Sequence, residues 1–478
     1  MPRSTIALLG RRERRRPHPI RGAPSAALLA AALLLSPAAA QSGGSADDAD
    51  AASAGPDTAI EVPDEPLLRL HGALMTNYRV RWTGEDSDQD LDQYIRLEGG
   101  PASGGVTGAL YLRVHGDLDA HGDSEGHTVF EDLWDTWDGR IQSRLYYGYL
   151  DFHRIPGTEL ARVGRMLLVE TPETFHVDGL YAESEEIADD LRVRFGGYGG
   201  IPVHLYESSA SGDSIIGAFA ASRPWSGGQL RIDASHIEDE AEGETEEDDL
   251  LGFAVEQRFA PRLGLALRHT RIDGASRDID AIADYIEPEL GFQAQLRWYD
   301  QPTTRHAATP ELDPFSASLH DLAPHQLVGG SVHQTVGEYV TVSLAYDERI
   351  LEDQGDESPF NHEYTRGSAT FAWQDWPWEG TGGFLTGDQW DSTGDDSRSL
   401  SGELFQEFAD SLRASLGSQY SRYEYDYLLQ EERDEVRSVY LSLEGPLEGA
   451  NRFRIEYEYE RDPFDEYHVV LVRFTHQF

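Results

Sequence analysis

The chain has no cysteine and no lysine, and beyond its first 40 residues it has no long apolar run. The absence of cysteine excludes disulfides, thiol catalysis, thiolate metal sites and covalent attachment of c-type haem. A membrane-spanning helix needs about 20 consecutive apolar residues, so none is expected after residue 40. Acidic residues number 86 against 39 basic ones, for a formal charge of −47. Such a surface repels nucleic acid, and no nucleic-acid partner is expected.

The first 40 residues have the layout of a secretory signal peptide. An arginine-rich stretch, residues 11–21, precedes an apolar run at residues 26–35 and three alanines at residues 38–40. This order predicts export and cleavage after Ala40, and the apolar run is too short to be a membrane anchor. Residues 41–66 are rich in Ala, Ser, Gly and Asp, which predicts a flexible periplasmic segment.

The C-terminal hairpin alternates apolar and polar residues with a period of two, as expected of strands with one oily face. One face of residues 467–478 carries Val470, Val472, Phe474, His476 and Phe478. In residues 452–460, Phe453, Ile455, Tyr457 and Tyr459 oppose Arg452, Arg454, Glu456 and Glu458. The wall of an outer-membrane barrel needs this alternation because one face meets lipid and the other meets water.

The same pattern recurs from residue 67 to the end, and it predicts an all-β fold. We expect residues 67–478 to form a transmembrane antiparallel up-and-down β-barrel of about 22 strands, within a range of 18–22. The weakest strand patterns are residues 279–285 and 326–333. A water-soluble β-sandwich or propeller is the alternative, since those folds also have many short strands with turn signals.

Two classes of connection alternate along the chain, as in outer-membrane barrels with short periplasmic turns and longer external loops. The short class comprises residues 99–105, 155–157, 196–200, 259–262, 287–289 and 445–446. The longer, acidic class comprises residues 84–92, 117–138, 170–190, 238–249, 300–323, 348–359 and 391–396. Strand-end aromatics predict interfacial girdles, with Trp82, Trp298 and Trp390 at outer ends and Phe152, Trp373 and Phe478 at inner ends.

Charged residues on the polar faces of the predicted strands are the candidates for lining a pore. They are Arg69, Arg79, Arg81, Arg113, Asp117, Asp233, Glu256, Arg297, Arg452, Arg454, Glu456 and Glu458. Opposed charges set a field that selects solutes. The alternative is that they pair across neighbouring strands without selecting anything.

A barrel of this size must be filled by water, by its own loops or by another protein. Residues 41–66 are too few for a plug domain, so residues 117–138, 170–190 and 300–323 are the loop candidates. The first contains Phe130, Trp134 and Trp137, and we predict that it folds inward as a constriction. The alternative is a loop packed on its neighbours outside the barrel.

The chain resembles Gram-negative porin-type outer-membrane barrels. Its last strand resembles the terminal targeting strand read by the barrel assembly machinery, which assigns that role to Phe474 and Phe478. Residues 78–82 and 94–97, and residues 149–152 with 163–165, resemble alginate-export-type porins. That resemblance implies passage of anionic polymers or small acidic solutes. A second resemblance, to the barrels of porin–cytochrome electron conduits, implies a periplasmic multihaem cytochrome as partner.

These observations predict a passive porin for small hydrophilic solutes in the outer membrane, contacting lipid and lipopolysaccharide. The conduit scaffold and the anionic polysaccharide exporter are the alternatives. No enzymatic activity is expected, because His320, Asp321 and His325 are close only in sequence and form no defined nucleophile–base pair. No cofactor is expected beyond weak divalent-cation binding by acidic external loops such as residues 86–90 and 117–123.

Overall fold

The computed structural model describes residues 68–84, 87–101, 104–118, 141–188, 190–203, 213–241, 244–303, 323–353, 362–393, 396–408, 411–426, 431–463 and 466–478. Within these ranges the chain forms a single 22-stranded sheet. The described residues include no helix with the length and apolar character required to cross a membrane.

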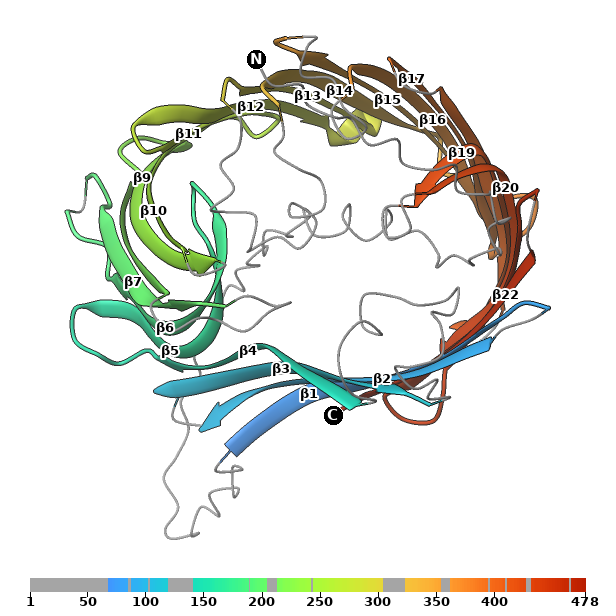
Figure 1. The fold of residues 1–478 in the computed structure, drawn as a ribbon, viewed down its shortest axis with the longest axis horizontal. Coiled ribbons are helices and arrows are strands. Elements are labelled where there is room, and N and C mark those ends of the chain that lie inside the picture. The colour runs from blue at the N-terminus through green and yellow to red at the C-terminus, as the bar shows by residue number, and fades with distance from the viewer. Residues whose placement is uncertain are drawn as a thin grey trace, which may run out of the picture.

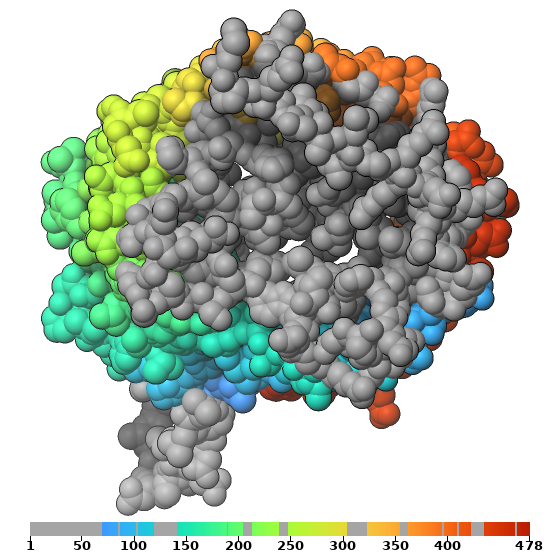
Figure 2. Space-filling view, viewed as in Figure 1, coloured from blue at the N-terminus to red at the C-terminus, as the bar shows by residue number. Residues whose placement is uncertain are grey.

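Every strand pairs antiparallel with its neighbours in sequence, and β1 pairs with β22, so the sheet closes into a barrel (Figure 1). The elements are β1 Leu68–Trp82, β2 Ser87–Pro101, β3 Val106–Asp117, β4 Ile141–Phe152, β5 Thr158–Val169, β6 Thr174–Ser184, β7 Arg194–Pro202, β8 Ser214–Ser222, β9 Gly228–Ala241, β10 Glu244–Ala260, β11 Leu263–Ile272, β12 Ala275–Glu287, η3 Pro288–Leu290, β13 Phe292–Gln301, β14 His325–Val336, β15 Val340–Leu351, β16 Tyr364–Gln374, β17 Thr381–Ser392, β18 Ser397–Glu407, β19 Arg413–Asp426, β20 Glu431–Pro446, β21 Asn451–Arg461 and β22 Glu466–Gln477. The coloured strands follow one another around the rim in chain order (Figure 2).

The outer face of the wall is apolar, because alternate residues of each strand point away from the lumen. Leu180 on β6, Leu296 on β13 and Leu441 on β20 are 63%, 66% and 56% exposed. Large apolar side chains left this open in a closed barrel form a lipid-facing band. The predicted all-β antiparallel barrel of about 22 strands is confirmed. The two segments with the weakest strand pattern, residues 279–285 and 326–333, do form strands and belong to β12 and β14.

Some predicted connections are wrong in detail. Residues 170–190 contain strand β6, which leaves only residues 170–173 as the outer connection. Residues 196–200 lie inside β7, so this glycine-rich sequence does not form the predicted turn. Trp390 faces the lumen, because Arg366 lies directly opposite it and stacks on its ring at 5.0 Å. The position of a tryptophan at a strand end therefore did not decide which face it takes.

The wall curls tightly between β5 and β11, on the left of Figure 1. Apolar side chains on its inner face pack against one another there. The side chains that fill this lobe form one buried cluster: Met166, Leu168, Phe175, Val177, Tyr198, Ile215, Ile237, Leu250 and Ile272. Met166, Phe175 and Val177 are completely buried. The barrel therefore combines a small lobe packed like a protein core with a larger lumen bounded by the remaining strands.

The wall also forks between β4 and β5. The ladder joins these strands over only five residue pairs, from Gly148↔Arg165 to Phe152↔Ala161, which makes it the shortest ladder among the described strands. Beyond these five pairs, towards the outer end of the barrel, β4 stays paired with β3, whereas β5 stays paired with β6 and enters the lobe. Gly164 stands at the fork with a φ of 128°. A Cβ there would lie 2.3 Å from the Gly148 carbonyl oxygen, so only glycine fits.

Candidate functional site

The strand register places the predicted pore-lining charges on the inner face, opposite to the exposed apolar residues. Arg69, Arg79 and Arg81 alternate on β1 with Leu70, whose side chain is 53% exposed. The same holds for the others, which lie on β3, β9, β10, β13 and β21: Arg113, Asp117, Asp233, Glu256, Arg297, Arg452, Arg454, Glu456 and Glu458. Their role in selecting solutes stays a prediction.

A network of arginines and carboxylates covers the outer half of the inner wall on β1 and β2. Arg79 Nη2 lies 2.6 Å from Asp90 Oδ2, and Arg81 Nε lies 2.7 Å from Asp88 Oδ2. Arg81 and Asp90 are completely buried. Buried charges must be paired in this way, because an unpaired one costs several kcal/mol.

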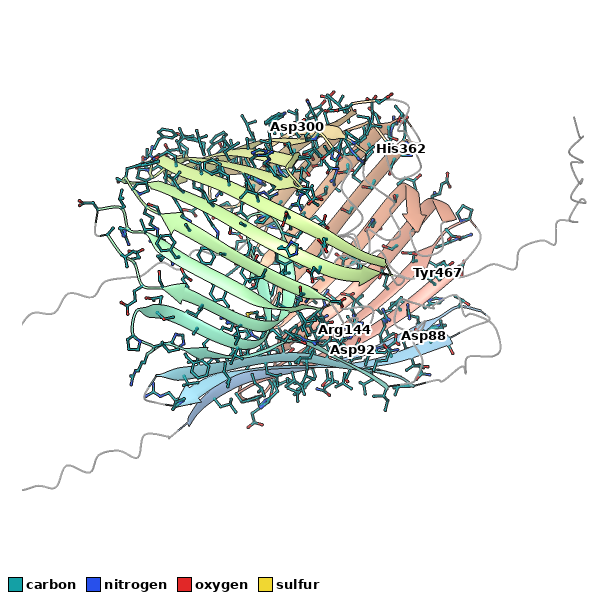
Figure 3. All side chains as sticks on the ribbon, turned by 60° about the vertical axis from the view of Figure 1, so that its left-hand side comes forward. Asp88, Asp92, Arg144, Asp300, His362 and Tyr467 are labelled. Atoms are coloured by element: carbon teal, nitrogen blue, oxygen red, sulfur yellow. The ribbon has the colours of Figure 1, made fainter. Side chains whose placement is uncertain are left out.

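The network continues onto β3. Arg113 Nε donates to Asp92 Oδ1 at 2.7 Å, and the ring of His115 lies 2.9 Å from the same oxygen. Figure 3 shows Asp88, Asp92 and Arg144 along one stretch of wall, with Asp300 and His362 on the wall across from them. The arginines of this stretch are therefore largely neutralised by neighbouring carboxylates.

Sequence reasoning missed the acidic half of this network. Asp88, Asp90 and Asp92 lie on β2, but residues 84–92 were expected to form an external loop. The signal was present: these aspartates alternate with Gln89 and Leu91, which is the period of a strand. The segment is so acidic that its composition also fits an external loop, and this made the strand pattern hard to recognise.

The remaining predicted charges lie in separate places around the wall. Arg297 donates two hydrogen bonds to Asp280, at 2.9 and 3.0 Å. Arg454 pairs with Glu456, whereas Glu458 lies opposite Tyr440 and Val469. The strand register places Asp117 opposite Asp90 and Arg69 opposite Gly100. It places Arg452 opposite Pro446 on one side and Thr475 on the other.

Asp233 and Glu256 belong to the lobe rather than to an open stretch of wall. Asp233 is only 2% exposed and accepts a hydrogen bond from Arg231 Nε at 2.8 Å. Glu256 lines a cavity of about 290 Å³ between the end of β5 and strands β9 to β12. Arg231, Arg268 and Asp280 also line it, so the cavity carries both signs of charge.

Residues 170–173 fold inward across the mouth of the lobe. Glu173 Oε2 lies 3.0 Å from Arg277 Nη1 on β12, and the same guanidinium donates to the Pro172 carbonyl. Glu170 pairs with Arg231 on β9. A Cβ at Gly252 on β10 would lie 2.8 Å from Thr171 and Pro172, so the segment packs directly on that strand. Of the predicted infolding loop at residues 170–190, only these four residues span the lobe.

Tyrosine rings form a strip on the inner wall from β2 to β4. The ring centroids of Tyr94 and Tyr111 lie 6.3 Å apart, and Tyr111 stacks on Tyr146 at 5.0 Å. Tyr147 and Tyr149 extend the strip at 5.7 Å. Arg162 on β5 closes it, with its guanidinium 3.8 Å from the Tyr149 ring centroid. The strip offers flat, partly apolar surfaces beside charged pairs, a combination that holds organic solutes by stacking and hydrogen bonding.

Several sequence predictions lie outside the described residues. These are the constriction residues Phe130, Trp134 and Trp137, and, in the acidic segments proposed to bind divalent cations, residues 86 and 119–123. Within the described ranges, no group of three or more His, Cys, Asp or Glu residues is arranged to hold a metal ion. Weak cation binding therefore stays a prediction.

No protein-family model and no curated protein sequence matches the chain. Solved structures of similar shape include the translocation pore of the P pilus usher PapC, with 10% identity, a TM-score of 0.47, and 86% of this chain and 99% of that chain covered. Pseudomonas aeruginosa OccK2 (OpdF) in complex with glucuronate has 9% identity and a TM-score of 0.42, with 86% and 96% covered. P. aeruginosa OpdK with vanillate has 12% identity and a TM-score of 0.41, with 86% and 99% covered. At such distances, function has to be argued from the wall of this barrel.

Proposed function

We propose that the protein is an outer-membrane porin that passes small hydrophilic solutes passively through a charged aqueous lumen. The observation that carries this proposal is the polarity of the inner wall on the side of the larger lumen. Arg79 on β1 and Arg454 on β21 lie on either side of β22, whereas Arg297 lies on β13 across the ring (Figure 1). Each of the three faces inward with an acidic partner. Charged walls of this kind are stable only against water or a polar occupant.

The pairing of these charges supports a mild rather than a strong preference for the charge of a solute. A polymer exporter for anions would be favoured by unpaired arginines facing the lumen. The arginines of β1 and β3 instead bind Asp88, Asp90 and Asp92. We therefore place small neutral or weakly charged solutes ahead of anionic polysaccharides.

Reconstitution in planar lipid bilayers tests the porin proposal. Folded protein, identified by heat-modifiable migration on gels, should produce discrete conductance steps and swelling of liposomes in arabinose. A heat-denatured sample is the control. Folded protein without conductance would overturn the proposal and favour a scaffold barrel whose bore is occupied by a periplasmic multihaem cytochrome.

A further inference from the structure

The inner face of β10 and β11 carries two charged side chains of opposite sign, and each of them faces an alanine. The register pairs Arg268 on β11 with Ala254 on β10, and Glu256 on β10 with Ala266 on β11. All four residues line the cavity of about 290 Å³. Glu256 and Arg268 are therefore diagonal neighbours, whose Cα atoms lie about 7–8 Å apart in such a ladder. The alanines between them fill little of the cavity floor.

The carboxylate of Glu256 is available to a ligand. Within the described part of the chain it makes no ion pair and no hydrogen bond, and Glu256 is exposed. The other two acidic residues that line the cavity are already bound, Glu170 by Arg231 and Asp280 by Arg297. A carboxylate without a partner is stable where water or a cationic group reaches it. The cavity therefore offers one negative group that can accept hydrogen bonds from a solute.

The guanidinium of Arg268 is available in the same way. Its Nη2 lies 3.9 Å from both Asp278 Oδ1 and Asp280 Oδ2, which is too long for hydrogen bonds. Its buried Nε has no hydrogen-bond partner among the residues that the structure describes. Both aspartates instead accept hydrogen bonds from other arginines at 2.9 Å, Asp278 from Arg277 and Asp280 from Arg297. Arg268 therefore keeps a planar fork of N–H donors that matches a carboxylate.

The remaining lining of the cavity is apolar or already committed to other contacts. Val169 and Ile282 add apolar surface to that of the two alanines. Arg231 donates to Asp233 at 2.8 Å and stacks on the ring of Phe219 at 4.0 Å, so its guanidinium is fixed. The volume lies near the lower end of the range for small-molecule sites, about 300–1,000 Å³. The cavity therefore fits a small solute rather than a polymer.

We propose that this cavity binds small zwitterionic solutes in which a short aliphatic body joins an amino group to a carboxylate. The ammonium donates to Glu256, the solute carboxylate accepts from Arg268, and the body lies on the alanine floor. A solute with one charge can satisfy only one of the two side chains, so it loses a charge-assisted hydrogen bond. The inference rests on the proposed porin function, because a solute reaches the cavity through the lumen, and it names a solute class for that lumen.

Calorimetric titration of the folded barrel in detergent tests the site, with 4-aminobutyrate as the probe. Butyrate and butylamine carry only one of its two charges and should bind about tenfold more weakly, or worse. Glu256→Gln and Arg268→Gln should weaken binding of 4-aminobutyrate by a similar factor. Glu448→Gln and Arg461→Gln remove the same charges outside the cavity and should bind like the native protein. Equal affinity for the three probes, or in all four variants, would overturn the proposal.

Protection of Arg268 in the native protein tests the site without any substitution. Phenylglyoxal modifies accessible arginines, and peptide mass spectrometry measures the rate at each one. 4-Aminobutyrate should slow modification of Arg268 several-fold and leave that of Arg461, an exposed arginine, unchanged. Butylamine should protect neither. An unchanged rate at Arg268, or equal protection by butylamine, would overturn the proposal.

Neither readout measures conductance, so this proposal and the porin proposal can fail separately. Binding of 4-aminobutyrate by a barrel without conductance would overturn the porin and leave the site. Conductance without binding would overturn the site alone.

Discussion

Gly72 and Phe478 exchange two backbone hydrogen bonds that complete the closure of the barrel. The Gly72 N–H donates to the Phe478 carbonyl at 2.9 Å, and the Phe478 N–H donates to the Gly72 carbonyl at 3.1 Å. The last residue of the chain is thereby paired with the first strand. The side chain of Phe478 remains half exposed at the inner end of the wall. Phe478 therefore helps to close the barrel, and together with Phe474 it is also the predicted assembly signal.

Deleting Phe478 should impair assembly in the outer membrane. The deletion removes both hydrogen bonds to Gly72 and the terminal aromatic ring. The measurement is the heat-modifiable fraction in isolated outer membranes. Phe259→Ala, at an exposed aromatic on the inner end of β10, is the matched control and should assemble normally. Assembly of the deletion variant at the control level would show that the terminal residue is dispensable.

Gly72→Ala should destabilise the barrel by about 1–3 kcal/mol, as overpacking does. A Cβ at Gly72 would lie 2.3 Å from the Arg96 carbonyl oxygen and 3.1 Å from the Phe478 ring. The free energy of unfolding in urea, measured in liposomes, checks this. At Gly367 on β16 a Cβ meets nothing within 4 Å, so Gly367→Ala should be neutral or slightly stabilising. A similar change in both variants would contradict the packing argument.

Replacing Arg81 by alanine should shift the channel towards cations. The change leaves buried Asp88 and Asp90 with less positive charge beside them, and breaking a buried pair costs about 3–5 kcal/mol. The reversal potential in a KCl gradient measures the shift. Arg461→Ala, at an exposed arginine on the outer end of β21, should leave it unchanged. An unchanged potential in folded Arg81→Ala protein would mean that this network does not face the ion path.

Arg277→Ala should release residues 170–173 from the lobe. The guanidinium is buried and holds both Glu173 and the Pro172 carbonyl, so its loss removes both anchors. Hydrogen–deuterium exchange of the peptide spanning these residues should increase markedly. Arg271→Ala, on the outward face of β11, is the control and should leave that exchange unchanged. Unaltered exchange in Arg277→Ala would show that the ion pair of Glu170 with Arg231 suffices.

The strands were predictable because period-two alternation is a local property of the sequence. It failed where side chains on both faces have the same polarity. Residues 166–169 of β5 are apolar on both faces, since Met166 and Leu168 enter the lobe core while Leu167 and Val169 lie on the opposite face of the strand. That double-sided pattern was the available sign of a filled lobe. The fork at Gly164 could not be predicted, because it depends on contacts of β5 with strands more than 60 residues away, such as that of Glu170 with Arg231.

Because of the packed lobe, the number of strands does not by itself give the width of the aqueous bore. Strands β5 to β11 add circumference, yet their buried apolar side chains fill part of the space that these strands enclose. A round cylinder with the same number of strands would enclose a wider aqueous bore. Conductance should accordingly resemble that of a barrel with fewer strands, and strand number alone would overestimate the largest solute that can pass.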